Sequence, residues 1–229
     1  PILPPSIALV VYGWLANVSI GGLFMAGLLP GILMALLLMG MTVLLAVSGK
    51  VVMPKPTPFD ACEVARTGKR AILPLMMPAI IVGGIWGGFF TPTEAGAIAS
   101  LYAVILGGLV YRDLNWRDLF NAFRRTLMFS AVILLIIAVS SFYGWILVRM
   151  GIPQALAGQV ASIDMPTILL LLCFALFFLL IGCFMSVIES ILIFTPIVVP
   201  AALSAGLDPV HFGIVMVITL SVGVITPPF

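Results

Sequence analysis

Charged side chains divide this chain into long uncharged stretches, and their spacing constrains the fold more than any other feature. A helix that crosses the apolar core of a bilayer needs about 20 residues. Most of the uncharged stretches reach that length. The sequence therefore predicts an all-α polytopic membrane protein. The uncharged stretches are residues 1–49, 71–93, 126–148, 165–188 and 209–229.

The composition also indicates a protein surrounded by lipid. Hydrophobic residues make up 63% of the chain and charged residues 8%, whereas a soluble domain has about 25% charged residues. The formal net charge of +2 is too small to indicate nucleic-acid binding. We interpret the three cysteines, Cys62, Cys173 and Cys183, as structural thiols.

Two apolar regions in the first half of the chain contain material that breaks helices. Residues 7–47 predict a short helix, a break at 17–22 and a full span over 23–47, because Asn, Ser and Gly disfavour a helix interior. Residues 73–110 are too long for one span, and the glycine-rich segment 83–94 interrupts them. We therefore expect broken helices in this half.

The second half predicts a span over 127–148, an external connection over 149–164 and a returning span over 167–186. The next stretch is expected to break at Glu189, at Pro196, at Pro200 and at 206–209. An apolar helix then leads to the end of the chain.

Two charged segments are predicted to face the cytoplasm, because cytoplasmic loops carry an excess of Lys and Arg. The first, residues 50–70, has the pattern of an interfacial amphipathic helix. The second is a loop from Arg112 to Arg125 that contains four arginines. Two membrane passes between these segments agree with both facing the same side.

Double prolines occur near both ends of the chain, in Pro4-Pro5-Ser6 and in Thr226-Pro227-Pro228. Paired interruptions of this kind indicate a transporter built from inverted repeats with its site between the halves. The chain starts without Met and stops in a turn-like sequence, so we expect it to be part of a longer protein.

Breaks in membrane helices point to binding sites, because non-helical backbone at membrane depth persists only where protein or a wet cavity surrounds it. Exposed carbonyls can bind a cation, and helix N-termini can bind an anion. Four segments have this character: residues 4–6, 17–22, 87–94 and 221–229.

Three ionisable residues need separate interpretation. Glu94 can be a cation or proton site within the membrane, or it can cap the helix that begins near it. Glu189 is expected at the interface with water. His211 is not expected to bind a metal, because no Cys or His cluster surrounds it.

No pairing of a nucleophile with a base and no phosphate-binding loop is present in the sequence. We therefore expect no catalytic residues, no cofactor and no ATP hydrolysis by this chain. A secondary transporter agrees with these absences.

Several separated motifs resemble the large membrane subunit of tripartite ATP-independent periplasmic (TRAP) transporters. They are GIWGGFFTPTEA at 84–95, GLDPVHFG at 206–213 and GVITPPF at 223–229, with LPPSI at 3–7, Tyr12-Gly13 and Ser19-Ile20-Gly21 as the matching part of the first half.

The resemblance implies an elevator-type transporter with inverted repeats and two re-entrant hairpins. Residues 1–48 would be the partial first repeat and 49–71 a cytoplasmic connection. Residues 72–229 would be the second repeat, with a broken helix at 84–96 and a partial hairpin at 209–229.

The resemblance also implies function and partners. The protein would be a multi-pass protein of the bacterial inner membrane that imports an organic acid, such as sialic acid or a C4-dicarboxylate, together with Na⁺. A small membrane subunit and a periplasmic substrate-binding protein would assist it. The alternatives are a receptor-independent sodium/proton or anion exchanger, and a non-transporting scaffold subunit.

We assign the binding residues on the matching motifs, because hard cations favour oxygen ligands. The predicted sodium ligands are Ser6, Asn17, Ser19, Gly21, Thr91, Thr93, Gly223 and Thr226. The predicted substrate contacts are Pro5, Glu94, Pro227 and Pro228.

Overall fold

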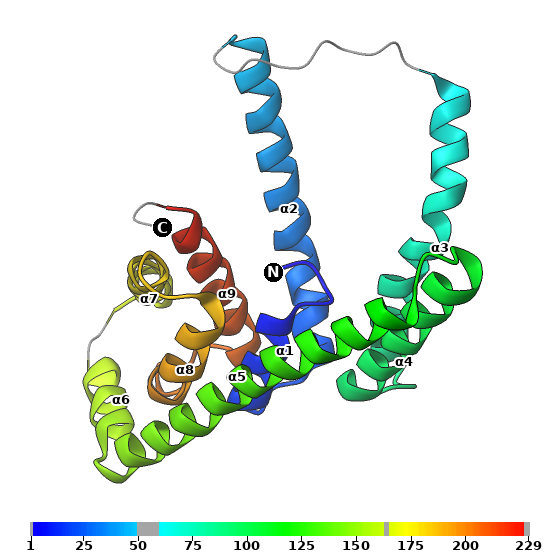
Figure 1. The fold of residues 1–229 in the computed structure, drawn as a ribbon. Coiled ribbons are helices and arrows are strands. Elements are labelled where there is room, and N and C mark those ends of the chain that lie inside the picture. The colour runs from blue at the N-terminus through cyan, green and yellow to red at the C-terminus, as the bar shows by residue number, and fades with distance from the viewer. Residues whose placement is uncertain (1, 50–59, 163–164, 227–229) are drawn as a thin grey trace. The chain divides into compact units, whose positions relative to one another are not determined.

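The computed structural model describes residues 2–49, 60–162 and 165–226, which contain helices and no strand. Figure 1 shows their course along the chain. The helices are α1 (Ile7–Ala16), α2 (Ile20–Val47), α3 (Ala61–Trp86), α4 (Pro92–Ile105) with a π-helical turn η1 (Leu106–Val110), α5 (Trp116–Arg149), α6 (Ile152–Ser162), α7 (Thr167–Gly182), α8 (Val187–Ser204) and α9 (Pro209–Ile225).

Among the described residues, five helices are long and apolar enough to cross a membrane: α2, α3, α4 continued by η1, α5 and α8. Helices α1, α7 and α9 are apolar but shorter, with 10, 16 and 17 residues. At 1.5 Å per residue, each is less than about 30 Å long, the thickness of the hydrocarbon core. The prediction of an all-α polytopic membrane protein is confirmed.

The chain divides by its internal contacts into two compact units. Unit 1 consists of Pro1–Gly27 and Leu114–Phe229, and unit 2 consists of Leu28–Asp113. This division describes packing, whereas the predicted repeat boundaries describe internal symmetry. The repeat boundaries therefore stay a prediction.

The core of unit 1 forms where α1 packs against α8 and α9. Tyr12 of α1 is fully buried, and its ring occupies the space beside Gly213 of α9, where any Cβ would overlap it. The Tyr12 hydroxyl donates a hydrogen bond of 2.7 Å to the carbonyl of Pro209 at the start of α9. This contact fixes α1 against a segment almost 200 positions later in the chain.

Helices α7 and α9 pack side by side in unit 1, running in the same direction. Phe212, in the first turn of α9, meets Phe174 and Phe178 of α7 with ring centroids 5.2 and 5.8 Å apart. Near their C-termini, Gly182 and Gly223 let the two backbones touch, and a Cβ on Gly182 would lie 2.6 Å from the Leu220 carbonyl oxygen. Small residues permit such close approach of membrane helices.

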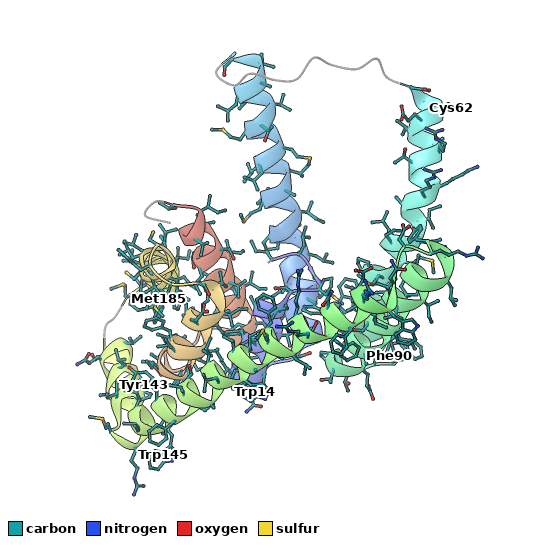
Figure 2. All side chains as sticks on the ribbon, viewed as in Figure 1. Trp14, Cys62, Phe90, Tyr143, Trp145 and Met185 are labelled. Atoms are coloured by element: carbon teal, nitrogen blue, oxygen red, sulfur yellow. The ribbon has the colours of Figure 1, made fainter. Side chains whose placement is uncertain are left out.

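In unit 2, α3 and α4 are joined by a tight turn at residues 87–91. Gly88 adopts a positive φ of 70°, a conformation that glycine reaches without steric cost. Phe90 is labelled in Figure 2. Its ring lies over Gly84 and leaves no room for a side chain there. The Tyr102 hydroxyl of α4 also bonds the Leu73 carbonyl of α3 at 2.8 Å.

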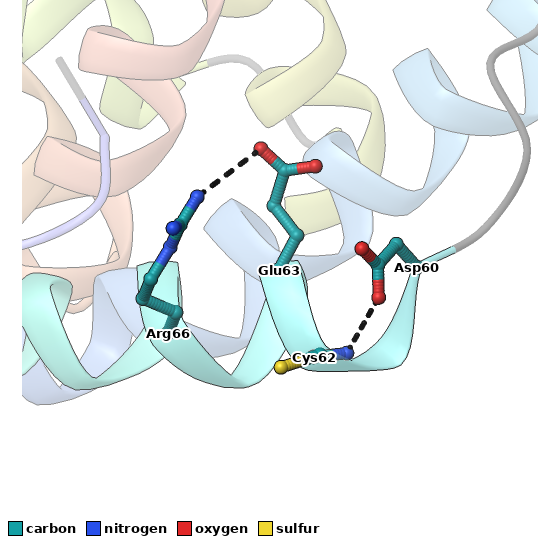
Figure 3. Close-up of polar contacts among 4 residues, drawn as sticks. All are labelled: Asp60, Cys62, Glu63 and Arg66. Atoms are coloured by element: carbon teal, nitrogen blue, oxygen red, sulfur yellow. Dashed lines mark hydrogen bonds and ion pairs between the residues drawn. The ribbon is translucent and has the colours of Figure 1, made fainter.

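The first turn of α3 is stabilised by local polar contacts (Figure 3). The Asp60 carboxylate caps the helix by accepting a hydrogen bond of 2.9 Å from the Cys62 amide. Glu63 and Arg66 form an exposed ion pair at 3.8 Å. Residues 50–59 of the predicted amphipathic segment lie outside the described residues. From Ala61 the segment continues without a break into the apolar part of α3 up to Trp86, so this part is not a separate helix.

Two predicted connections prove to be largely helical. The loop expected from Arg112 to Arg125 ends early, because α5 starts at Trp116 and includes most of its arginines. The connection expected over 149–164 contains α6. Both predictions took charged residues and glycines as signs of a loop. In the structure these residues lie on exposed helix faces and at helix ends, where they are compatible with a helix.

The breaks predicted at Glu189, Pro196 and Pro200 are wrong, because α8 runs without interruption from Val187 to Ser204. Each proline removes one backbone hydrogen bond from the helix, but packing neighbours can compensate for this loss in membrane helices. Helices α1, α5, α6 and α9 all pack on α8. The break predicted at 206–209 is confirmed, between α8 and α9.

The contact between α7 and α9 leads to a stability prediction for the full-length protein. We expect Gly182→Ala to destabilise it by about 1–3 kcal/mol, because the added methyl overpacks a backbone contact. The thermal unfolding midpoint in detergent measures this. Gly158→Ala in α6 is the matched control, since a Cβ there meets nothing within 4 Å. An equal loss of stability in both variants would contradict the packing role of Gly182.

Candidate functional site

The α1–α2 break spans Asn17, Val18 and Ser19. Asn17 ends α1 in the left-handed conformation, with φ 54° and ψ 43°, which Asn tolerates better than most residues. Ser19 caps α2, because its Oγ accepts a hydrogen bond of 3.2 Å from the Gly22 amide. Both side chains are exposed, and Gly21 lies in the first turn of α2.

Backbone carbonyls remain available at this break. The amides of Asn17 and Val18 both donate to the Gly13 carbonyl. Consequently the next three carbonyls receive no backbone hydrogen bond from the residues that the structure describes; they belong to Trp14, Leu15 and Ala16. A set of free carbonyls beside a hydroxyl group is a chemical environment suited to a small cation.

Ser6 starts α1 and is buried, with 3% of its surface exposed. Its Oγ accepts a hydrogen bond of 3.4 Å from the Leu9 amide, which makes it the N-cap. Pro5 precedes it and is exposed. Since Ser6 and Asn17 flank the ten residues of α1, they are about 16 Å apart along the helix axis.

The start of α4 is a complete capping box. The Thr91 hydroxyl accepts a hydrogen bond of 3.3 Å from the Glu94 amide, and Glu94 Oε2 accepts bonds of 2.8 Å from both the amide and the hydroxyl of Thr91. The capping role predicted for Glu94 is confirmed. Its role as a cation or substrate contact stays a prediction, as does that of the neighbouring exposed Thr93.

At the end of α9, the Thr226 hydroxyl donates to the Val222 carbonyl at 3.1 Å, and its amide donates to the Gly223 carbonyl at 2.9 Å. Gly223 is buried against Gly182, so its backbone is part of a helix contact. Pro227 and Pro228 lie outside the described residues.

The structure therefore brings the predicted sodium ligands into local capping pairs rather than into one shell within unit 1. Ser6 and Asn17 are separated by the length of α1. Thr226 is separated from the contact with α1 as well, because it lies 13 residues beyond Gly213, about 20 Å along the axis of α9. Gly213 is the position that packs on Tyr12 of α1. Thr91, Thr93 and Glu94 belong to unit 2.

Two polar groups at the start of α8 were missed or misplaced by sequence reasoning. Glu189 was expected at the interface with water, but its Oε2 is buried. Ser190 gave no signal and is fully buried. Neither Glu189 Oε2 nor Ser190 Oγ has a hydrogen-bond partner within the described part of the chain. Such groups are rare in native proteins and call for an explanation.

Glu189 lies one helical turn before a cavity of about 300 Å³ between α1, α5 and α8. Leu192 and Pro196, which follow it by three and seven residues on the same helix face, line this cavity together with Ser140 and Ser141 of α5. An ionisable residue among membrane helices, here with one buried oxygen that lacks a partner in the described part of the chain, is a functional hypothesis by default. The only sequence signal was an acidic residue within an apolar run.

These features define a class of protein: a multi-pass α-helical membrane protein whose helices are interrupted at capped breaks with free polar groups. The whole chain, residues 1–229, matches the family described as "Tripartite ATP-independent periplasmic transporter, DctM component". The chain belongs to this family, as its motifs predicted, and it is a multi-pass protein of the bacterial inner membrane.

Curated relatives agree with this assignment. The chain is 39% identical over its full length to the sialic acid TRAP transporter large permease protein SiaM of Vibrio cholerae and covers 53% of that protein. It is 38% identical to the ectoine TRAP transporter large permease protein TeaC of Halomonas elongata, over 100% of the chain and 53% of the relative. With the C4-dicarboxylate TRAP transporter large permease protein DctM of Pseudomonas aeruginosa it shares 35% identity, over 99% of the chain and 53% of the relative. The chain thus spans about half the length of these relatives.

Two buried serines of unit 1 give opposite stability predictions. Ser6→Ala should cost about 1 kcal/mol, because it removes a helix cap. Ser190→Ala should leave stability unchanged or raise it, because it removes a buried hydroxyl that lacks a partner. Thermal unfolding of the purified full-length protein measures both. An equal loss in Ser190→Ala would show that its hydroxyl has a partner in the functioning protein.

Proposed function

We propose that this chain is part of the large membrane subunit of a sodium-coupled transporter that imports a small organic acid. The observation that carries the proposal is the α1–α2 break. There, three backbone carbonyls that receive no backbone hydrogen bond from the described residues lie next to a capping serine. Interrupted helices of this kind coordinate coupling ions in secondary transporters. Family membership supports transport in general.

Sodium is proposed to bind at the breaks through backbone carbonyls and hydroxyl groups. A capping hydroxyl still has a lone pair to offer a cation, because it uses only one to accept the amide hydrogen bond. Capping and ion binding are therefore compatible for Ser19 and Thr91. The proposed ligands are Ser6, Asn17, Ser19, Gly21, Thr91, Thr93, Gly223 and Thr226.

The substrate is proposed to be a small organic acid. Relatives are named for sialic acid, ectoine and C4-dicarboxylates, and this range leaves the particular substrate open. Helix N-termini attract anionic groups, and the proposed substrate contacts next to such ends are Pro5 and Glu94, with Pro227 and Pro228 at the second double proline. Bound sodium would compensate the negative charge of the substrate, so that the loaded site crosses the apolar barrier more readily.

The complete transporter is proposed to contain a small membrane subunit and a periplasmic substrate-binding protein, and to move its site by an elevator-type displacement. Support comes from the family and from a relative named as an isethionate TRAP transporter permease protein DctMQ. The short apolar helices α1, α7 and α9 support the presence of half-helices that end inside the membrane.

Sodium dependence of uptake tests the ion site. Ser19→Ala and Thr226→Ala in the full-length protein should raise the sodium concentration for half-maximal uptake by about three- to tenfold, because each removes one oxygen ligand. Asn17→Gly should raise this sodium concentration by less, since glycine keeps the left-handed backbone conformation and the backbone carbonyls. Ser162→Ala, at an exposed hydroxyl in α6, is the control. Unchanged sodium dependence in both Ser19→Ala and Thr226→Ala would remove the assignment.

Uptake with and without a soluble receptor tests the assembly. In proteoliposomes that contain both membrane subunits, we expect accumulation of the acid only when the cognate periplasmic protein and a sodium gradient are both present. The result follows if the receptor supplies substrate to the outward-facing site. Equal uptake without the receptor would favour a receptor-independent exchanger instead.

A further inference from the structure

The first three turns of α5 carry a stripe of exposed aromatic and aliphatic side chains. Trp116, Phe120, Phe123 and Leu127 are 85%, 72%, 65% and 67% exposed. Their spacing of four, three and four residues places them on one face of the helix. A face of this kind is costly in water, so this surface must be covered by an apolar environment in the native protein.

An arginine stripe runs directly beside the aromatic one. Arg117, Arg124 and Arg125, with Asn121 between them, are exposed. At a rotation of about 100° per residue, Arg117 and Arg124 lie on the flank of the aromatic face, whereas Arg125 lies on the opposite side of the helix. In the segment 116–127 the one acidic residue is Asp118, which lies in the first turn of α5 on the same side of the helix as Arg125.

These arginines form no ion pair with a residue that the structure describes. Over the described ranges 2–49, 60–162 and 165–226 one ion pair is present, and it lies in α3. Between the two stripes, Trp116, Arg117, Phe120 and Asn121 line an open hollow of about 370 Å³. Guanidinium and amide donors thus meet two aromatic rings on one surface.

This combination fits one chemical partner. Indole and phenyl rings favour the boundary between acyl chains and headgroups, whereas guanidinium groups bind phosphate oxygens in a bidentate geometry. A soluble anion would explain the arginines but not the aromatic stripe. A zwitterionic lipid carries a cation that opposes the arginines, so an anionic phospholipid gives the best charge complementarity.

We propose that residues 116–127 of α5 form a binding surface for anionic phospholipid, with the phosphate held in the hollow by Arg117 and Asn121 and the acyl chains against the aromatic stripe. Arg124 and Arg125 extend the positive surface along the headgroup layer. The surface is independent of the sodium and substrate sites proposed above.

Fluorescence of a single tryptophan tests the proposal at the surface itself. Full-length protein is prepared with Trp116 as its single tryptophan: Trp14, Trp86, Trp145 and every tryptophan outside residues 1–229 are changed to Phe. Bilayers contain brominated phosphatidylglycerol or brominated phosphatidylcholine as quencher. We expect stronger quenching of Trp116 by phosphatidylglycerol. A version that keeps only Trp145, which is 61% exposed at the other end of α5, should show no headgroup preference.

Charge variants test whether the arginines cause the preference of Trp116 for phosphatidylglycerol. Changing Arg117, Arg124 and Arg125 together to Gln should reduce the preference of Trp116 for phosphatidylglycerol by about tenfold, because each arginine contributes to headgroup attraction. The same three positions changed to Lys should keep most of it, which also controls for misfolding. A charge-matched control changes three basic residues of α3 to Gln and should keep the preference: Arg66, Lys69 and Arg70.

Four outcomes would overturn the proposal. The Gln variant could keep the preference, or the α3 control could lose it equally, which would indicate only the net charge of the protein. Inorganic phosphate in the buffer could abolish the preference without lipid exchange, which would indicate a soluble anion site. Addition of the small membrane subunit could shield Trp116 from both lipids, which would indicate a protein interface.

Discussion

Backbone hydrogen bonding in an apolar environment is the constraint on which the rest of this structure depends. A membrane interior offers no water to an unpaired amide or carbonyl, yet this chain interrupts its apolar helices repeatedly. It resolves the conflict with local side chains at the helix starts. Ser6, Ser19, Thr91 and Asp208 each accept a backbone amide hydrogen bond at the N-terminus of a helix. Three carbonyls at the end of α1 are an exception, because they receive no backbone hydrogen bond from the residues that the structure describes.

Close packing between helices from distant parts of the chain holds the broken helices in place. The Tyr12 ring against Gly213 and the Tyr12 hydrogen bond to Pro209 connect α1 to α9. The backbone contact between Gly182 and Gly223 does the same for α7 and α9. Each short helix has too few residues to be stable alone, so these contacts, rather than helix propensity, position the breaks within unit 1.

At the start of α8, in contrast, polar side-chain atoms are buried without a partner among the described residues. Glu189 Oε2 and Ser190 Oγ are buried in the described part of the chain without hydrogen-bond partners. A buried group without a partner costs about 1–3 kcal/mol, and a helix of this composition could carry apolar residues there instead. The cavity lined by Ser140 and Ser141 begins one helical turn later, at Leu192.

The sequence by itself determined the class of fold, most helices and three of the helix breaks, because hydropathy, glycine content and capping chemistry act over a few neighbouring residues. Asn17, Thr91 with Glu94, and the Gly206–Pro209 turn were all readable in this way. Only the tertiary structure decided that α8 passes through Pro196 and Pro200, that α5 includes the arginine-rich segment, and that Glu189 Oε2 is buried. The course of α8 and the burial of Glu189 Oε2 depend on which helices pack around a residue, and that information is carried by positions far away in the chain. The arginines of α5 are exposed, so their charge did not exclude a helix.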